Sequence, residues 1–99
     1  MLDIKKDLDG SKLVLSLEGR LDTITAPELE EVVKSSIAGI DDLTFDFEKL
    51  EYVSSAGLRV LLSTQKIMMG QGTMVVKNVS DVIREIFDVT GFSDILTIE

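Results

Sequence analysis

The amino-acid sequence predicts a small α/β protein in which helices pack on one β-sheet. Short segments with apolar residues at every second position, typical of strands, come between longer segments with apolar residues at helical spacing. From Ala26 onward the two kinds of segment alternate, which is the usual order of parallel strands joined by helical crossovers. The chain has 99 residues, 44% of them hydrophobic, and this fits a single globular domain.

The first two predicted strands form a hairpin. Leu2 to Leu8 and Lys12 to Leu17 favour β-structure, and the turn residues Asp9 to Ser11 lie between them. Leucines alternate with other residues in the second of these runs, as expected of a strand with one buried face. Gly19 to Ile24 then forms a connection to the first helix.

The first helix should run from about Ala26 to Ala38. Thr25 and Glu28 have the spacing of a capping box at its start, and Gly39 is a natural stop after its end. Apolar residues recur at helical spacing along this segment, so one face of the helix should pack on the sheet.

A third strand and a second helix occupy the middle of the chain. Leu43 to Phe47 alternates apolar and polar residues, whereas Glu48 to Val53 is expected to be a loop. The helix should begin at Ser54-Ser55 and continue toward Met69, because turn-forming glycines follow it.

The last third of the chain predicts two more strands and one more helix. Thr73 to Val76 is a short strand, Ser80 caps a helix that stops near Gly91, and Ile95 to Ile98 is expected to be a final strand. We therefore expect a small mixed sheet that combines an N-terminal hairpin with βα crossovers.

Composition argues against several functional classes. The formal net charge is −8 and the ten basic residues are scattered, which opposes binding to nucleic acid or to an anionic membrane surface. No apolar run approaches the roughly 20 residues of a membrane span, and we expect a cytoplasmic protein without membrane insertion. Cysteine and histidine are absent, so disulfides are excluded and transition-metal sites lose their commonest ligands; we expect no metal and no cofactor.

The residues also lack the usual arrangements for catalysis. A nucleophilic serine needs a neighbouring base, and neither histidine nor a G-x-S-x-G turn is present. No phosphate-binding loop of the form G-x-x-x-x-G-K-[ST] occurs. The paired acids Asp41-Asp42 and Glu30-Glu31 are adjacent in sequence, so the two side chains of each pair point in different directions. We expect a binding protein and not an enzyme.

The stretch V-S-S-A-G-L, residues 53 to 58, permits a structural and a functional interpretation. A serine at a helix N-terminus caps the helix, which is worth about 1 kcal/mol, and Gly57 allows close packing. The same position exposes a hydroxyl that could carry a phosphate near the positive end of the helix dipole. The two roles are compatible.

Several segments resemble the STAS domain of bacterial anti-sigma factor antagonists. The strongest match is D-F-E-K-L-E-Y-V-S-S-A-G-L-R-V-L-L, and further matches are G-R-L-D-T-I-T-A-P, G-T-M-V-V and I-F-D-V-T-G-F. The resemblance covers nearly the whole chain and implies one STAS domain over residues 1–99.

This resemblance implies a partner-switching cycle. In the family, a serine at the start of the helix after the third strand is phosphorylated by the anti-sigma factor, which is itself a serine kinase; the matching residue here is Ser55. The unphosphorylated protein would bind the kinase and free a sigma factor, thereby regulating transcription. The phosphorylated protein would release the kinase until a serine phosphatase restored it. The implied partner-binding residues are Asp22, Thr23, Thr25, Ser54, Ala56, Gly57 and Leu58, with Thr23 and Thr25 expected to be exposed.

Two departures from the family pattern D-S-[ST]-G keep alternatives open. Ser54 replaces the aspartate before the serine, and Ala56 replaces the residue after it, so that Ser54 is a second candidate acceptor. The alternative function is that of a STAS accessory subunit that docks on a membrane transporter or a scaffold complex without a phosphate switch.

Overall fold

A computed structural model describes all residues from 1 to 99 and contains one four-stranded sheet with the strand order β1-β2-β3-β4. β1 runs antiparallel to β2, whereas β2, β3 and β4 are parallel to one another. The elements in chain order are β1 (Leu2–Asp9), β2 (Lys12–Leu21), α1 (Ala26–Ser36), β3 (Asp42–Val53), α2 (Ser55–Met69), β4 (Thr73–Lys77), α3 (Asp81–Thr90) and the 3-10 turn η1 (Phe92–Asp94). The predicted mixed sheet with an N-terminal hairpin and helical crossovers is confirmed.

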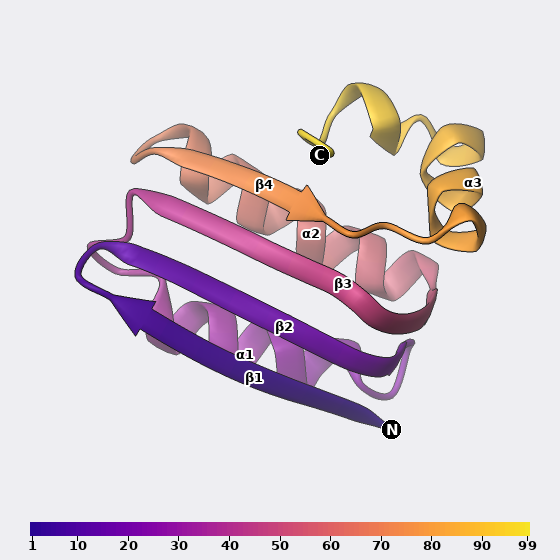
Figure 1. The fold of residues 1–99 in the computed structure, drawn as a ribbon, viewed down its shortest axis with the longest axis horizontal. Helices are drawn as coiled ribbons and strands as arrows, with labels where there is room; N and C mark the ends of the chain where they lie inside the picture. Colours follow the sequence, from indigo (N-terminus) through magenta and orange to yellow (C-terminus); the bar gives the residue numbers. More distant parts are fainter.

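One face of the sheet is covered by helices and the other is open. Figure 1 shows α1 and α2 together behind the sheet, with α3 beyond the end of β4 and no helix in front. Helices collect on the covered face because the alternating strand residues Leu13, Leu15 and Leu17 point there, as do Leu43 and Phe45 of β3. These side chains belong to one cluster of 24 buried apolar residues. Complete burial of each large apolar side chain contributes roughly 1.5–3 kcal/mol.

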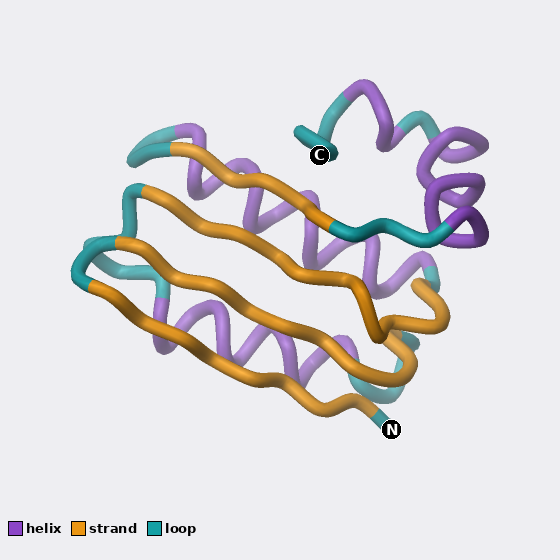
Figure 2. The backbone as a smooth tube through the Cα atoms, in the orientation of Figure 1, coloured by secondary structure: helices purple, strands orange, loops and turns teal.

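β3 is longer than its alternation pattern predicts, and the expected loop at residues 48–53 is wrong. Figure 2 shows strand geometry continuing to the bend before α2. The register between β2 and β3 shifts twice, so β3 has extra residues opposite β2. The buried residues of this stretch, Phe47, Leu50 and Val53, therefore recur at every third position instead of every second one.

Two further expectations at element ends are corrected. Residues 95–98 do not form a strand; after the turn η1, Ile98 makes a single parallel bridge to Val76. The capping box is also not formed, because the Thr25 side chain makes no capping hydrogen bond to α1. It bonds back to the loop that precedes the helix.

Candidate switch site at the start of α2

The candidate site lies at the edge of the sheet where β2 and β3 end. Since the two strands are parallel, the loops that follow them leave the sheet on the same side. The Ser54 N–H donates to the Leu21 carbonyl over 2.8 Å and ties the two loops together. We call residues 20–25 and 53–58 the Ser55 edge.

The two adjacent serines have different local environments. Ser54 is the N-cap of α2: its backbone is extended, with φ −91° and ψ 175°, and its hydroxyl accepts from the Gly57 N–H at 3.3 Å. The Ser54 carbonyl accepts the first helical bond, from Leu58 N–H at 2.9 Å. Ser55 is the first residue of the helix and is exposed. Capping and exposure are thus divided between the two serines, and Ser55 is the accessible one.

Gly57 allows the start of α2 to pack tightly on the end of β2. A Cβ at this position would lie 2.7 Å from Leu21 Cγ and 3.1 Å from the Leu21 carbonyl oxygen. Leu21 is completely buried, so it has little room to move. The expected close packing at Gly57 is therefore confirmed. It fixes where the Ser55 hydroxyl lies relative to the β2–α1 loop.

Hydrogen bonds within the β2–α1 loop fix its conformation. The Asp22 carboxylate accepts from the backbone N–H groups of Ile24 and Thr25, at 3.0 and 3.1 Å. The Thr25 hydroxyl accepts from the Asp22 N–H at 2.9 Å and donates to the Arg20 carbonyl at 2.8 Å. The hydrogen bond from the Thr25 backbone, followed by those from the Ile24 backbone and the Thr25 side chain, lowers the pKa of Asp22 from its usual value.

Burial separates the predicted site residues into three groups. Ser55 and Thr23 are exposed; Asp22, Ser54 and Ala56 are half-buried; Thr25, Gly57 and Leu58 are buried. The expectation that Thr25 is exposed is wrong, because only 3% of its surface is accessible to solvent. The buried residues can shape the site but offer no side chain to a partner.

Ile24 is an exposed residue of this edge that sequence reasoning missed. It is 83% exposed although it is a large aliphatic residue, and its N–H is held by Asp22. The sequence signal was the isolated isoleucine between two threonines in a polar loop.

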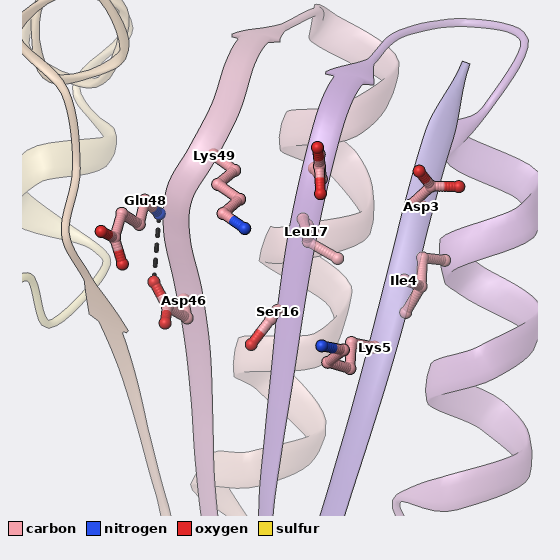
Figure 3. A pocket seen from close by; sticks show the side chains of 9 residues that line it. Asp3, Ile4, Lys5, Ser16, Leu17, Asp46, Glu48 and Lys49 are labelled. Atoms are coloured by element: carbon pink, nitrogen blue, oxygen red, sulfur yellow. Dashed lines mark hydrogen bonds between the residues drawn. The ribbon is translucent and has the colours of Figure 1, made fainter.

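Two hollows of similar size lie on opposite faces of the sheet. The first, of about 490 Å³, is on the open face, where four acidic side chains surround Lys5 and Lys49. Figure 3 shows this hollow and the hydrogen bond from the Glu48 N–H to Asp46. The second, of about 480 Å³, is between α1 and α2 and includes Ala56, which follows Ser55. Only the second hollow adjoins the Ser55 edge.

Two other structural features bear on the function. None of the helices combines the length and apolar character needed to cross a lipid bilayer. No group of three or more acidic residues is arranged to hold a metal ion.

Comparison with known proteins identifies the family. Residues 3–99 match the family model of the STAS domain. The anti-sigma-B factor antagonist of Staphylococcus aureus is 33% identical over 97 residues, which cover 96% of this chain and 90% of that protein. Its name describes a regulatory role, not an enzymatic one.

Solved structures have the same fold. A crystal structure of an anti-sigma factor antagonist from Mycobacterium paratuberculosis matches with a TM-score of 0.89 at 22% identity, covering 99% of this chain and 85% of that chain. The Bacillus protein SpoIIAA matches at 18% identity in its unphosphorylated and phosphorylated forms, with TM-scores of 0.78 and 0.77. Those two matches cover 98% of this chain and 87% and 91% of the respective SpoIIAA chains. The sequence matches and the shared fold together show that this chain belongs to the STAS domain family.

Proposed function

We propose that this protein is an anti-sigma factor antagonist that works by partner switching in the cytoplasm. In its unphosphorylated form it binds an anti-sigma factor that is also a serine kinase, and a sigma factor is freed. Phosphorylation of Ser55 by that kinase ends the binding, and a serine phosphatase restores it. The name of the 33% identical relative supports the antagonist role.

The observation that carries this proposal is the exposed hydroxyl of Ser55 beside a serine that already caps the helix. Because Ser54 serves as the N-cap, modification of Ser55 leaves the cap in place. The first turn of α2 contains no acidic residue that would repel a phosphate, and its backbone N–H groups favour negative charge. The fold can therefore accept a phosphate on Ser55 without losing a structural contact.

A phosphate would change the surface of the Ser55 edge and leave the core intact. It would add nearly two negative charges and three acceptor oxygens at the exposed helix start. The neighbouring loop is held by Asp22 and Thr25, so the edge cannot easily rearrange to relieve a clash with a closely packed partner. Loss of binding is the expected consequence.

Phosphosite mapping tests the proposal. The protein and its Ser55→Ala and Ser54→Ala variants are incubated with ATP and an extract of the source cells, and phosphopeptides are assigned by mass spectrometry. We expect phosphate on Ser55 in the unchanged protein and in Ser54→Ala, and none at this site in Ser55→Ala. The phosphorylated protein, purified, should no longer bind the kinase that modified it.

Two outcomes would contradict this assignment. Phosphate on Ser54 in the unchanged protein would move the switch to the capping residue. No phosphate in an extract that contains an active kinase of this type would favour the alternative role, constitutive docking on a transporter or scaffold complex.

A further inference from the structure

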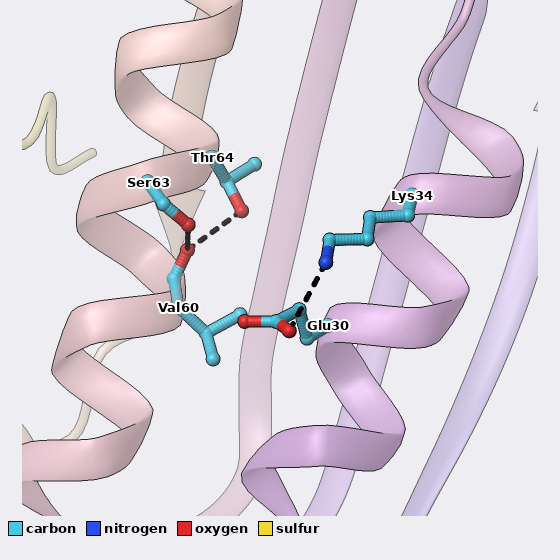
Figure 4. Close-up of polar contacts among 5 residues, drawn as sticks. All are labelled: Glu30, Lys34, Val60, Ser63 and Thr64. Atoms are coloured by element: carbon cyan, nitrogen blue, oxygen red, sulfur yellow. Dashed lines mark hydrogen bonds and ion pairs between the residues drawn. The ribbon is translucent and has the colours of Figure 1, made fainter.

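The hollow between α1 and α2 is a groove that begins next to the candidate phosphorylation site. Small or short side chains, Ala26 and Pro27 on α1 and Ala56 on α2, line its end near Ser55. Buried Val60 lies in its middle. Figure 4 shows the two helices on either side, with Glu30 extending from α1 toward Val60 on α2. A short apolar strip, formed by Ala26, Pro27, Ala56 and Val60, thus runs between the polar side chains of the groove, starting at the Ser55 edge.

The charges of this groove are opposite to those of the chain as a whole. The chain carries a formal net charge of −8, yet the groove is lined by Arg59 and Lys66 and by one acid, Glu30. Glu30 already pairs with Lys34 at 3.3 Å, whereas Arg59 and Lys66 take part in none of the three ion pairs of the structure. Both are exposed. The groove therefore offers two free cations beside an apolar strip.

We propose that this groove binds an acidic amphipathic helix of the anti-sigma factor, an inference that rests on the partner switch proposed for Ser55. Arg59 and Lys66 are seven residues apart, so they lie on one side of α2, about 10 Å apart along its axis. Carboxylates two turns apart on a partner helix match this spacing. Apolar residues of that helix would pack against Pro27 and Ala56, above the buried Val60.

The position of Arg59 links groove binding to the phosphate switch. Arg59 follows Ser55 by four residues, which places the two side chains next to each other on the helix surface. A phosphate on Ser55 would repel an acidic partner helix and would also form an ion pair with Arg59. Phosphorylation thus removes one of the two cations that the partner needs.

A peptide titration tests the groove directly. The probe is a synthetic helical peptide of leucine, alanine and glutamate with its leucines on one face, added to the 15N-labelled protein and followed by NMR. We expect saturable shifts of the backbone signals of Ala56, Val60 and Ser63. The same peptide with lysine in place of glutamate should cause none of these shifts.

Paired charge variants supply the controls. Arg59→Gln with Lys66→Gln should weaken binding of the glutamate peptide about three- to tenfold. Lys5→Gln with Lys49→Gln removes two exposed lysines from the hollow on the open face and should leave the affinity unchanged. Equal weakening by both double variants, shifts spread over both faces, or no saturable binding would overturn the inference.

The peptide experiment is independent of the phosphorylation experiment. It involves neither kinase nor ATP, so failure of the groove to bind the peptide would not affect the conclusion from phosphosite mapping of Ser55. If the protein binds the peptide but is not phosphorylated, the groove is supported as a binding site and the phosphate switch is contradicted.

Discussion

The Ser55 edge and the open face of the sheet are both polar surfaces, but they are constructed differently. At the edge, the polar side chains of Asp22, Thr25 and Ser54 each hydrogen-bond to backbone N–H groups. On the open face, only Asp46 accepts such a bond, from the Glu48 N–H, whereas Lys5 and Ser16 project from the strands without one, as Figure 3 illustrates. Specific side chains are therefore required along the edge, whereas positions 5 and 16 of the open face tolerate many polar residues. The exposed hydroxyl of Ser55 therefore differs from the neighbouring polar groups of the edge, because it has no structural task.

Gly57→Ala is the substitution at the edge for which we expect the largest effect. The added Cβ would lie 2.7 Å from Leu21 Cγ, and Leu21 is completely buried. Overpacking of this kind costs about 1–3 kcal/mol, and the better helix preference of alanine offsets part of it. We expect the free energy of unfolding, measured by urea denaturation, to fall by about 1–2 kcal/mol.

Gly70→Ala at the other end of α2 is the matched control. A Cβ there has an ordinary contact of 3.5 Å with the Ile67 carbonyl oxygen, and its φ of −88° suits any residue. Its effect should stay within about 0.5 kcal/mol. If the two glycine variants are equally stable, the tight packing of α2 on β2 is not a constraint on the Ser55 edge.

Three serine-to-alanine variants separate the cap from the exposed hydroxyl and from the open face. Ser54→Ala removes the acceptor for the Gly57 N–H and should lower the free energy of unfolding by about 1 kcal/mol. Ser55→Ala and Ser16→Ala should each change it by less than about 0.5 kcal/mol. Thermal and urea denaturation would measure all three. A Ser55→Ala variant as unstable as Ser54→Ala would mean that Ser55 also has a structural task.

The regular elements could be predicted from the sequence because their signals are local. Turn residues mark the hairpin, and glycines follow each helix. The extension of β3 could not be predicted in this way. Because its register shifts against β2, the buried residues Phe47, Leu50 and Val53 are three positions apart. A regular strand buries every second residue, so its pattern does not predict this spacing. The expected last strand failed because a short apolar run does not specify strand pairing; this run forms only one bridge, Ile98 with Val76 of β4, through the backbones of Thr97 and Glu99.

The position of the candidate site could be predicted from the sequence, but the structural role of each of its residues could not. The stretch around Ser54-Ser55 indicated a helix start, and parallel strands bring that start near the β2–α1 loop. Which serine caps the helix depends on one backbone conformation, which composition does not determine. The position of the Thr25 side chain depends on the conformation of the β2–α1 loop, since its hydroxyl bonds to Arg20 and Asp22 and not to its own helix.

The smallest expected effect concerns the pH dependence contributed by Asp22. Its pKa in the folded protein is lowered below the ordinary value of 3.8, chiefly by the hydrogen bond from the Thr25 backbone, so the folded state binds this proton less readily than the unfolded state. The resulting stability is present above a pH of about 3.8 and is lost as the pH falls through the lower folded-state pKa.

Asp22→Asn keeps an acceptor oxygen but cannot titrate. The stability difference between the unchanged protein and Asp22→Asn should therefore shrink below a pH of about 3.8, as measured by urea denaturation at several pH values. Asp9→Asn in the exposed hairpin turn changes the net charge equally, and an identical pH profile for both variants would assign the effect to net charge instead of the Ser55 edge.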